Sequence, residues 1–211
     1  MDLKKRAKEM QDFFNNKIDT YDQVHASFMD TKKALVDSLS GDVHKVLDLG
    51  AGTGLELIHL FEKYPDVSVT VIDVSESMLE ELKKREFADK VTCLCGDFFE
   101  LSFGDEYDAV ISTSALHHFN EEDKSKLYKK VLDCLKKGGE FINCDKVVMS
   151  QEEQDSAFQE YNEDPHKYPH MDTPLTKENE SKILKNVGFN EVKSLDIDNV
   201  KDNYALIKAV K

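Results

Sequence analysis

The stretch that most constrains the fold is an apolar run that stops at three alternating glycines. The run covers residues 43–49, and the glycines follow at positions 50, 52 and 54. Apolar residues at helical spacing then begin at Leu55 and continue to Phe61. This pattern predicts a strand, a tight turn and a helix, because glycine adopts positive φ at little steric cost and lets a ligand approach the backbone. The unpaired N–H groups at the start of the helix favour a polar or anionic ligand.

A second apolar run ends at an acid that can complete a nucleoside site. Asp73 lies 23 positions after Gly50. An acid about 20 residues beyond a glycine turn can accept hydrogen bonds from both ribose hydroxyls. A dinucleotide fingerprint would need glycine at position 55, where this chain has Leu55. The glycine spacing therefore argues against a dinucleotide ligand.

Strands and helices alternate along most of the chain. Ser75 is a predicted helix cap, Lys136 and Lys137 with two following glycines predict a helix end, and Gly188 predicts another. The alternation predicts a doubly wound parallel sheet with helices on both faces. Two final runs are so close in sequence that they must pair antiparallel. The predicted strands are 67–73, 91–95, 107–113, 140–148, 191–200 and 203–210, and the helices are 76–86, 121–136 and 176–187.

Two segments lie outside this alternation. Residues 3–40 predict helices ahead of the sheet, the first with Leu3, Ala7, Met10 and Phe14 on one face, the second capped by Asp19 or Thr20 and the third by Asp30 or Thr31. Residues 149–175 contain three of the four prolines, and six acids without Lys or Arg lie between Glu152 and Asp164. We read this segment as an insertion with a short helix at 151–162, and such insertions commonly carry specificity.

The glycine turn also carries a family resemblance. The stretch Leu47-Asp48-Leu49-Gly50-Ala51-Gly52-Thr53-Gly54 resembles motif I of the class I methyltransferases that use S-adenosylmethionine (SAM), in the small-molecule, methyltransferase domain 25/11-like group. The resemblance implies a Rossmann-like sheet of seven strands in the order 3-2-1-4-5-7-6, with strand 7 antiparallel. It implies a helical lid at 1–41 and a SAM-binding domain at 42–211 with an inserted cap at about 149–175.

The resemblance assigns cofactor contacts at four loops. It implies that the turn of Asp48, Gly50, Ala51, Gly52 and Gly54 holds the methionine and ribose, and that Asp73 binds the ribose hydroxyls. Gly96-Asp97-Phe98 resembles the motif in which an acid accepts from the adenine amino group. Val74 and Phe98 are then expected to pack on the adenine, Ser112 to lie near the methionine ammonium, and Met78 to belong to the cofactor-binding residues.

Two residues are candidates for the chemistry. Tyr21, in the N-terminal segment, is a candidate to touch the methionine end of SAM, with a packing role as the alternative. His117 is a candidate to lie near the reacting methyl group or to act as general base, and plain packing or helix capping is the alternative. Methyl transfer is an in-line displacement, so the protein mainly has to align the reactants. A base helps only where the acceptor carries a proton.

Composition limits the partners and the compartment. The formal net charge is −14 and the pI about 4.9, which argues against non-specific nucleic-acid binding and against anionic membranes. The chain has no apolar window of about 18 residues, and its basic N-terminus lacks an apolar core, so we expect no membrane span, no signal peptide and a cytoplasmic protein. The oligomeric state stays open, a homodimer included.

No metal site is expected. Cys93, Cys95, Cys134 and Cys144 lie in apolar patterns without a C-x-x-C pair and are expected to be buried, reduced thiols. Pro169 interrupts the pair His166 and His170, which argues against metal binding by these residues. The acidic insertion suggests a cationic acceptor such as an amine, with a solvated helix face as the alternative.

The leading hypothesis is a SAM-dependent methyltransferase that acts on a small molecule. One alternative is a tRNA wobble-base modifying enzyme of the same fold, which would need a basic patch beside the site. The other is a SAM-binding protein that transfers no methyl group. The sequence does not name the acceptor atom.

Overall fold

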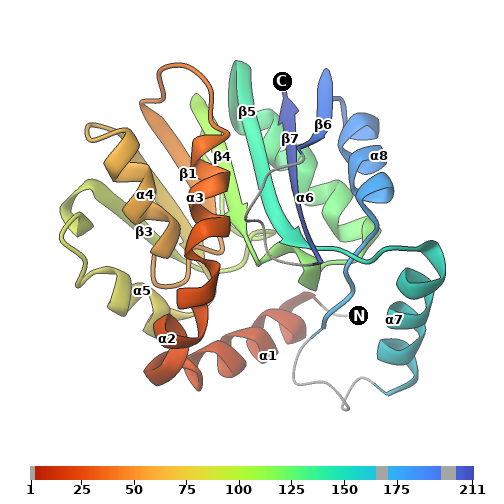
Figure 1. Ribbon diagram of the computed structural model, residues 1–211. Coiled ribbons are helices and arrows are strands. Elements are labelled where there is room, and N and C mark those ends of the chain that lie inside the picture. Colours follow the sequence, from red (N-terminus) through yellow and green to blue (C-terminus); the bar gives the residue numbers. More distant parts are fainter. Residues whose placement is uncertain (1–2, 165–170, 196–202) are drawn as a thin grey trace.

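The molecule is built on one sheet of seven strands. The computed structural model describes residues 3–164, 171–195 and 203–211. The strands lie in the order β3-β2-β1-β4-β5-β7-β6 (Figure 1). Their bounds are β1 (Lys45–Leu49), β2 (Ser68–Asp73), β3 (Val91–Cys95), β4 (Tyr107–Thr113), β5 (Leu135–Lys146), β6 (Glu191–Leu195) and β7 (Tyr204–Val210).

Strand directions agree with the predicted topology. The first five strands are parallel, and β7 is antiparallel to both β5 and β6. Strand β1 is central, with β2 on one side and β4 on the other, and the chain therefore winds outward from β1 in both directions. The predicted order and the antiparallel seventh strand are confirmed.

Helices cover both faces of the sheet. Successive side chains of a strand point to opposite faces, so Val46 belongs to one buried cluster and Leu47 to the other. Helices α3, α4 and α5 contribute to the Val46 cluster, and α6 and α8 to the Leu47 cluster. The bounds are α3 (Met29–Asp37), α4 (Leu55–Lys63), α5 (Glu76–Leu82), α6 (Glu121–Cys134) and α8 (Lys177–Val187).

The N-terminal helices lie at one edge of this layered core. Helix α1 (Leu3–Asn15) runs along the edge where the parallel strands end, below the sheet in Figure 1. It contacts α5, and the short helix α2 (Tyr21–His25) follows it. Helix α7 (Gln151–Glu163) lies to one side of the sheet (Figure 1). The open carboxyl edge of the sheet is thus covered by α1.

The sequence predicts some helix ends correctly and others wrongly. The Ser75 hydroxyl accepts from the Met78 N–H at 3.3 Å, and Gly188 ends α8 with φ 114°, as predicted. Asp30 and Thr31 do not cap a helix, because α3 begins earlier, at Met29, directly after a 3-10 turn. Thr20 precedes α2 without a side-chain hydrogen bond to its backbone.

Strand β5 begins earlier than the sequence suggests. The predicted helix 121–136 ends at Cys134, and Leu135 already pairs with Tyr107 of β4. Lys136 and Lys137, which the sequence pattern predicts at a helix end, therefore belong to strand β5. The predicted run 191–200 is described only to Leu195, so its last residues lie outside the described part of the chain.

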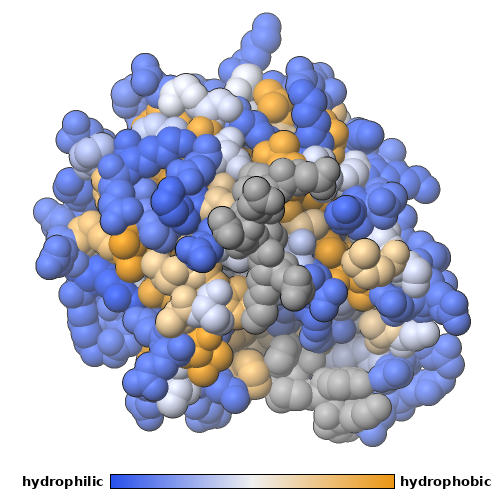
Figure 2. All heavy atoms as spheres, viewed as in Figure 1, coloured by the Kyte–Doolittle hydropathy of each residue, from blue (hydrophilic) through white to orange (hydrophobic). Residues whose placement is uncertain are grey.

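The viewed surface is largely hydrophilic. Figure 2 shows hydrophilic side chains over much of the viewed face, with hydrophobic residues in separate groups between them. Among the described residues no helix has the length and apolar character needed to cross a bilayer. All four cysteines are free, and Cys134 and Cys144 are buried as expected. Cys93 is only half-buried and Cys95 is exposed, because β3 is an edge strand, so the prediction of burial is wrong for these two residues.

Candidate active site

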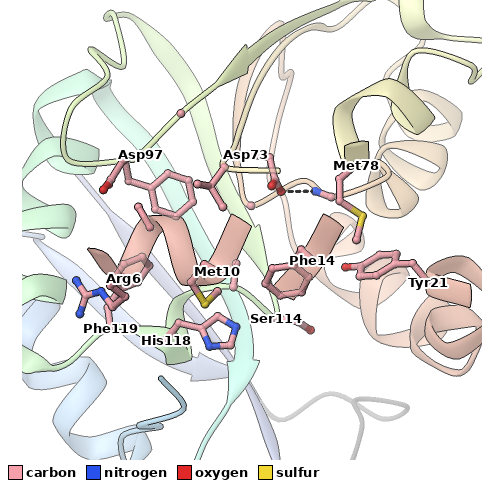
Figure 3. A pocket seen from close by; sticks show the side chains of 17 residues that line it. Arg6, Met10, Phe14, Tyr21, Asp73, Met78, Asp97, Ser114, His118 and Phe119 are labelled. Atoms are coloured by element: carbon pink, nitrogen blue, oxygen red, sulfur yellow. Dashed lines mark hydrogen bonds between the residues drawn. The ribbon is translucent and has the colours of Figure 1, made fainter. Parts of the chain in front are cut away.

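A cavity lies between α1 and the carboxyl ends of the strands. The space in and around it, counted together with the solvent at its mouth, is about 720 Å³. Figure 3 shows Asp97 and Asp73 along one side and Arg6, Met10 and His118 along the other. The lining residues are Arg6, Ala7, Met10, Phe14, Tyr21, Gly50, Gly52, Asp73, Val74, Met78, Gly96, Asp97, Phe98, Ser114, Ala115, His118 and Phe119.

The glycine turn forms the floor of the cavity. Gly50 has φ 79° and Gly52 has φ 53°, conformations that other residues rarely adopt. A Cβ at Gly50 would lie 2.4 Å from the Ala115 Cβ, so the loop after β4 can approach only because this residue is glycine. The turn therefore brings the ends of β1 and β4 into contact beneath the cavity.

Asp73 is held in place by backbone donors. Its Oδ2 accepts from the Gly52 N–H at 2.8 Å, and its Oδ1 accepts from the Ser75 N–H at 2.8 Å. Burial raises the pKa of Asp73 to about 6, although the two backbone N–H groups act in the opposite direction. A fixed carboxylate at the end of β2 can accept hydrogen bonds from the two hydroxyls of a ribose.

Asp97 and Phe98 supply an acid and an aromatic ring at the end of β3. The Asp97 Oδ1 accepts from the Phe99 N–H at 2.8 Å, and the Phe98 side chain is buried beside the cavity. The Lys130 ammonium donates to the Phe98 carbonyl, which holds this loop against α6. Such a pair suits a flat ring that carries an amino group.

Asp48 lies beneath the turn rather than in the cavity lining. Its carboxyl oxygens are buried, with no hydrogen-bond partner among the described residues. Burial and the nearby Glu56 carboxylate raise the pKa of Asp48 well above its ordinary value. Glu56 is paired with Lys32 at 2.8 Å, so a buried lysine offsets part of the negative charge under the turn.

His117 is fixed by a carboxylate, and its neighbour His118 reaches the cavity. The His117 Nδ1 lies 2.6 Å from the Asp145 Oδ1, and the Asp145 Oδ2 accepts from the Leu116 and His117 N–H groups. Burial alone would raise the pKa of Asp145, but the His117 imidazole, the Lys124 ammonium and the Lys146 N–H lower it overall. The two histidine rings are 3.9 Å apart, and the His118 Nδ1 lies 2.6 Å from the Met171 carbonyl oxygen.

Tyr21 lies at the opposite end of the cavity from Arg6 (Figure 3). Asp22, the next residue, accepts from the Thr53 hydroxyl at 2.6 Å and from Arg85 at 2.5 Å, which fixes α2 to the glycine turn. Burial, followed by the Glu56 and Asp73 carboxylates, raises the pKa of Tyr21 above its ordinary value. Its hydroxyl therefore keeps its proton and can donate a hydrogen bond.

Helix α1 is attached to the rim by side chains along its length. The Gln11 amide donates to the Val74 carbonyl at 3.1 Å. The Asn15 Oδ1 accepts from the hydroxyls of Ser75 at 2.8 Å and Ser77 at 2.7 Å. Near the other end, Arg6 forms a buried ion pair with Asp123 of α6 at 2.9 Å.

The structure brings together most, but not all, of the residues selected from the sequence. Those that line the cavity are Tyr21, Gly50, Gly52, Asp73, Val74, Met78, Asp97 and Phe98. Those outside the lining are Asp48, Ala51, Gly54, Ser112 and His117; Ser112 donates to the Leu49 carbonyl at 2.7 Å. Gly96, part of the Gly96-Asp97-Phe98 motif, also lines the cavity. The sequence does not single out the other lining residues as site residues, although it predicts Ala7, Met10 and Phe14 on one helix face; they are Arg6, Ala7, Met10, Phe14, Ser114, Ala115, His118 and Phe119.

Metal chemistry has no visible support in the described residues. No group of three or more His, Cys, Asp or Glu side chains is placed to hold a metal there. His166 and His170 lie outside the described residues.

The fold and the cavity together define a class of nucleoside-binding protein. A doubly wound sheet places a glycine turn, a ribose-type acid and an acid beside an aromatic ring at the ends of β1, β2 and β3. This is the arrangement of a Rossmann-like protein that binds a nucleoside cofactor.

Comparison with known proteins gives the family. A family model described as a methyltransferase domain matches residues 46–139. An uncharacterized methyltransferase of Geobacillus sp. is 30% identical over 161 residues, which cover 74% of this chain and 72% of the relative. A malonyl-[acyl-carrier protein] O-methyltransferase of Priestia megaterium is 34% identical over 128 residues, covering 56% of this chain and 45% of the relative. This chain belongs to the SAM-dependent class I methyltransferases, and the predicted family and cofactor class are confirmed.

A solved structure supports the same fold. Phosphoethanolamine N-methyltransferase 2 of Haemonchus contortus, in complex with SAM, has a TM-score of 0.74 at 18% identity. The match covers 96% of this chain and 60% of that one. The chain thus spans only about half of the length of several relatives that it matches.

Proposed function

We propose that this protein transfers a methyl group from SAM to a small-molecule acceptor. The observation that carries the proposal is Asp73: a carboxylate fixed by two backbone N–H groups at the end of β2, in a cavity also lined by Asp97 and Phe98. Bound SAM supplies a methyl group on a positively charged sulfur, which is open to in-line attack. The chain's own task is to hold the donor, align the acceptor and exclude water.

Different residues of the cavity bind the different parts of SAM. Asp73 accepts from the ribose hydroxyls, and Asp97 with Phe98 binds the adenine. Gly50 and Gly52 let the methionine end approach the backbone, and the protonated Tyr21 hydroxyl donates to that end. Asp48 lies beneath the turn, where the charges of the buried Lys32 and Glu56 act on it. Ala51, Gly54 and Ser112 keep the shape of the strand ends.

The N-terminal segment serves as the lid of the site. Helix α1 covers the carboxyl edge and contributes Arg6, Ala7, Met10 and Phe14 to the lining. Residues 42–211 then form the SAM-binding domain with the inserted cap at about 149–175, of which Met171 contacts Arg6 and His118 of the cavity lining. A covered site keeps water from the reacting atoms.

His117 is the candidate base for an acceptor that carries a proton. Its Nδ1 is engaged by Asp145, which leaves Nε2 to accept a proton. The His117 ring does not line the cavity, whereas the adjacent His118 ring does, so proton transfer to His117 would need His118 or a water as a relay. Asp145 is a positioning residue in this scheme. The variant Asp145→Asn should lower kcat while leaving donor affinity unchanged, whereas a fall in donor affinity alone would contradict the scheme.

We propose that the methyl acceptor is a small molecule. The named relatives act on a malonyl-acyl carrier protein and on phosphoethanolamine, so their names do not agree on one acceptor atom. The net charge of −14 argues against tRNA as a substrate. A SAM-binding protein without transfer would bind the donor equally well and differ only in turnover.

Calorimetric titration tests the proposal. SAM and S-adenosylhomocysteine (SAH) should bind with micromolar or tighter dissociation constants, and NAD should not bind. The same preparation is then incubated with SAM and pools of small acceptors while SAH formation is followed. Absence of binding by either adenosyl ligand would contradict the proposal, and binding without turnover on any pool would favour the non-catalytic alternative. Turnover that requires tRNA would favour the tRNA enzyme.

A further inference from the structure

A cluster of three charged side chains lies buried beneath the glycine turn. The Lys32 ammonium of α3 pairs with the Glu56 carboxylate of α4 at 2.8 Å, and both charges act on the Asp48 carboxyl group of β1. Lys32 is 4% exposed, Glu56 1% and Asp48 0%. Both Asp48 carboxyl oxygens and the Glu56 Oε1 have no hydrogen-bond partner among the described residues. Buried carboxyl oxygens without partners are costly, so this buried cluster calls for a physical explanation.

Strand register places Asp48 directly below the cavity. Asp48 pairs with Val71 of β2 on one side and with Ile111 of β4 on the other. Residues two positions apart on a strand point to the same face of the sheet. Asp73 and Thr113 therefore lie on the same face as Asp48, one row nearer to the carboxyl edge. The Thr113 hydroxyl is also buried without a hydrogen-bond partner among the described residues.

The proposed binding of SAM puts its sulfur above this row. Asp73 binds the ribose, and Gly50, Gly52 and Tyr21 receive the methionine end. The sulfur is bonded to both parts of the donor, so it lies between Asp73 and the glycine turn, over the carboxyl end of β1. Burial, and then the Glu56 and Asp73 carboxylates, raise the pKa of Tyr21. The charge beneath the turn therefore acts at this end of the cavity.

Negative charge is in excess below the sulfur. The buried cluster and Asp73 together contain three carboxyl groups and one ammonium group. Burial and then the Glu56 carboxylate raise the pKa of Asp48, and the Lys32 ammonium acts in the opposite direction. A positive charge above the row stabilises the ionised carboxyl groups, and a neutral atom does not. SAM has a positively charged sulfur and SAH a neutral one, whereas their ammonium and carboxylate groups are the same.

We infer that the carboxyl groups of Asp48 and Glu56 favour the positively charged sulfur of SAM over the neutral sulfur of SAH. This inference rests on the proposed function. The buried cluster does not line the cavity, so it acts on the sulfur through space, which the low dielectric of the interior permits. Asp48 is then a specificity residue, and Lys32 limits the preference by offsetting the charge of Glu56. Methyl transfer removes the positive charge from the donor and the attraction with it, which favours release of the product.

The preference is coupled to a proton on Asp48. Burial favours the protonated form in the free protein, and the positive sulfur favours the ionised form, so SAM should release more protons than SAH on binding. The charged groups that face Asp48 are Glu56 of α4, Lys32 of α3 and Asp73 of β2. The Tyr21 hydroxyl of α2 and the Cys144 thiol of β5 keep their protons, because burial raises both pKa values. Asp73 does not distinguish the two ligands, because both present the same ribose.

The test compares wild type, Asp48→Asn and Asp97→Asn by calorimetric titration with SAM and with SAH at pH 7.5. Asp48→Asn removes the charge and keeps the shape of the side chain. Asp97→Asn is the matched control, because it removes a carboxyl group at the proposed adenine end. The ratio of the SAH to the SAM dissociation constant should fall at least ~5-fold in Asp48→Asn and stay unchanged in Asp97→Asn. A purely structural role of Asp48 would weaken both ligands equally and leave the ratio unchanged.

A second measurement needs no variant. Wild type is titrated at pH 6.5, where the ammonium groups of both ligands stay protonated, in two buffers that differ in ionisation enthalpy. The number of protons released should be larger for SAM than for SAH.

Equal ratios in wild type and Asp48→Asn, an equal fall in both variants, or equal proton release for the two ligands would overturn the inference while the proposed function stands. If wild type binds neither ligand, the proposed function itself fails and this inference falls with it.

Discussion

The two sides of the cavity are held by different kinds of contact. On the donor side, Asp73 and the glycine turn are fixed by backbone hydrogen bonds at the ends of adjacent parallel strands. On the lid side, α1 is held by side chains: Arg6 to Asp123, and Gln11 and Asn15 to the rim near α5. The donor side is therefore as rigid as the sheet, whereas α1 can separate from it by breaking a few contacts. A site of this kind can bind its donor in a preformed half and close the other half over it.

The largest expected effect is on donor binding through Asp73. The variant Asp73→Ala removes two charge-assisted hydrogen bonds to the ribose, each of which contributes about 1.5–3 kcal/mol. SAH affinity should fall at least ~100-fold in calorimetry, with the circular dichroism spectrum unchanged. Asp97→Ala, which removes one contact to the adenine, should cost much less. Equal losses for the two variants would contradict the assignment of the ribose to Asp73.

The next effect concerns the stability of the glycine turn. In Gly50→Ala the new Cβ would lie 2.4 Å from the Ala115 Cβ at a positive φ. The free energy of unfolding should fall by about 2–5 kcal/mol in urea denaturation. Gly41→Ala is the matched control, because Gly41 also has positive φ but no atom within 4 Å of the added Cβ. Gly41→Ala should lower the free energy of unfolding by only about 1–2 kcal/mol. Equal losses for the two variants would show that the close approach of the β4 loop to Gly50 does not matter for stability.

A moderate effect is expected from pH. The free protein retains a proton on Asp73 below about pH 6, since burial raises this pKa from 3.8. Donor binding requires the carboxylate and must release that proton, so SAH affinity should fall as the pH drops, by about tenfold between pH 7.5 and pH 5. For the free protein the sign is opposite: folding favours the protonated form, and this contribution to stability is lost as the pH rises from about 4 through about 6. Asp73→Asn should make SAH affinity independent of pH in this range; a persistent tenfold change would assign the proton to another group.

The smallest expected effect is on the lid. Asn15→Ala removes the acceptor of two hydroxyl hydrogen bonds that join α1 to the rim. SAH should dissociate about threefold to tenfold faster in stopped-flow measurements, with little change in the association rate. Asn16→Ala is the control, because exposed Asn16 donates only within α1. If both variants dissociate at the wild-type rate, α1 does not retain the donor.

The same contrast explains what could be predicted from sequence. The donor side follows local rules: an apolar run, glycines at fixed spacing and Asp73 at the next strand end, so its residues were found together with the order of the sheet. Arg6, His118 and Phe119 lack such a signal, because their positions depend on how α1 and the loop after β4 pack across the sheet. The start of β5 at Leu135 was missed for a related reason: pairing with Tyr107 outweighs the local helix-end pattern.

The most direct test of the account is a crystal structure of the protein with SAH bound. We expect the ribose hydroxyls within about 2.5–3.0 Å of the Asp73 carboxylate, the adenine beside Phe98 with its amino group at Asp97, and α1 closed over the ligand. A ligand bound outside this cavity, or a ribose turned away from Asp73, would contradict the account.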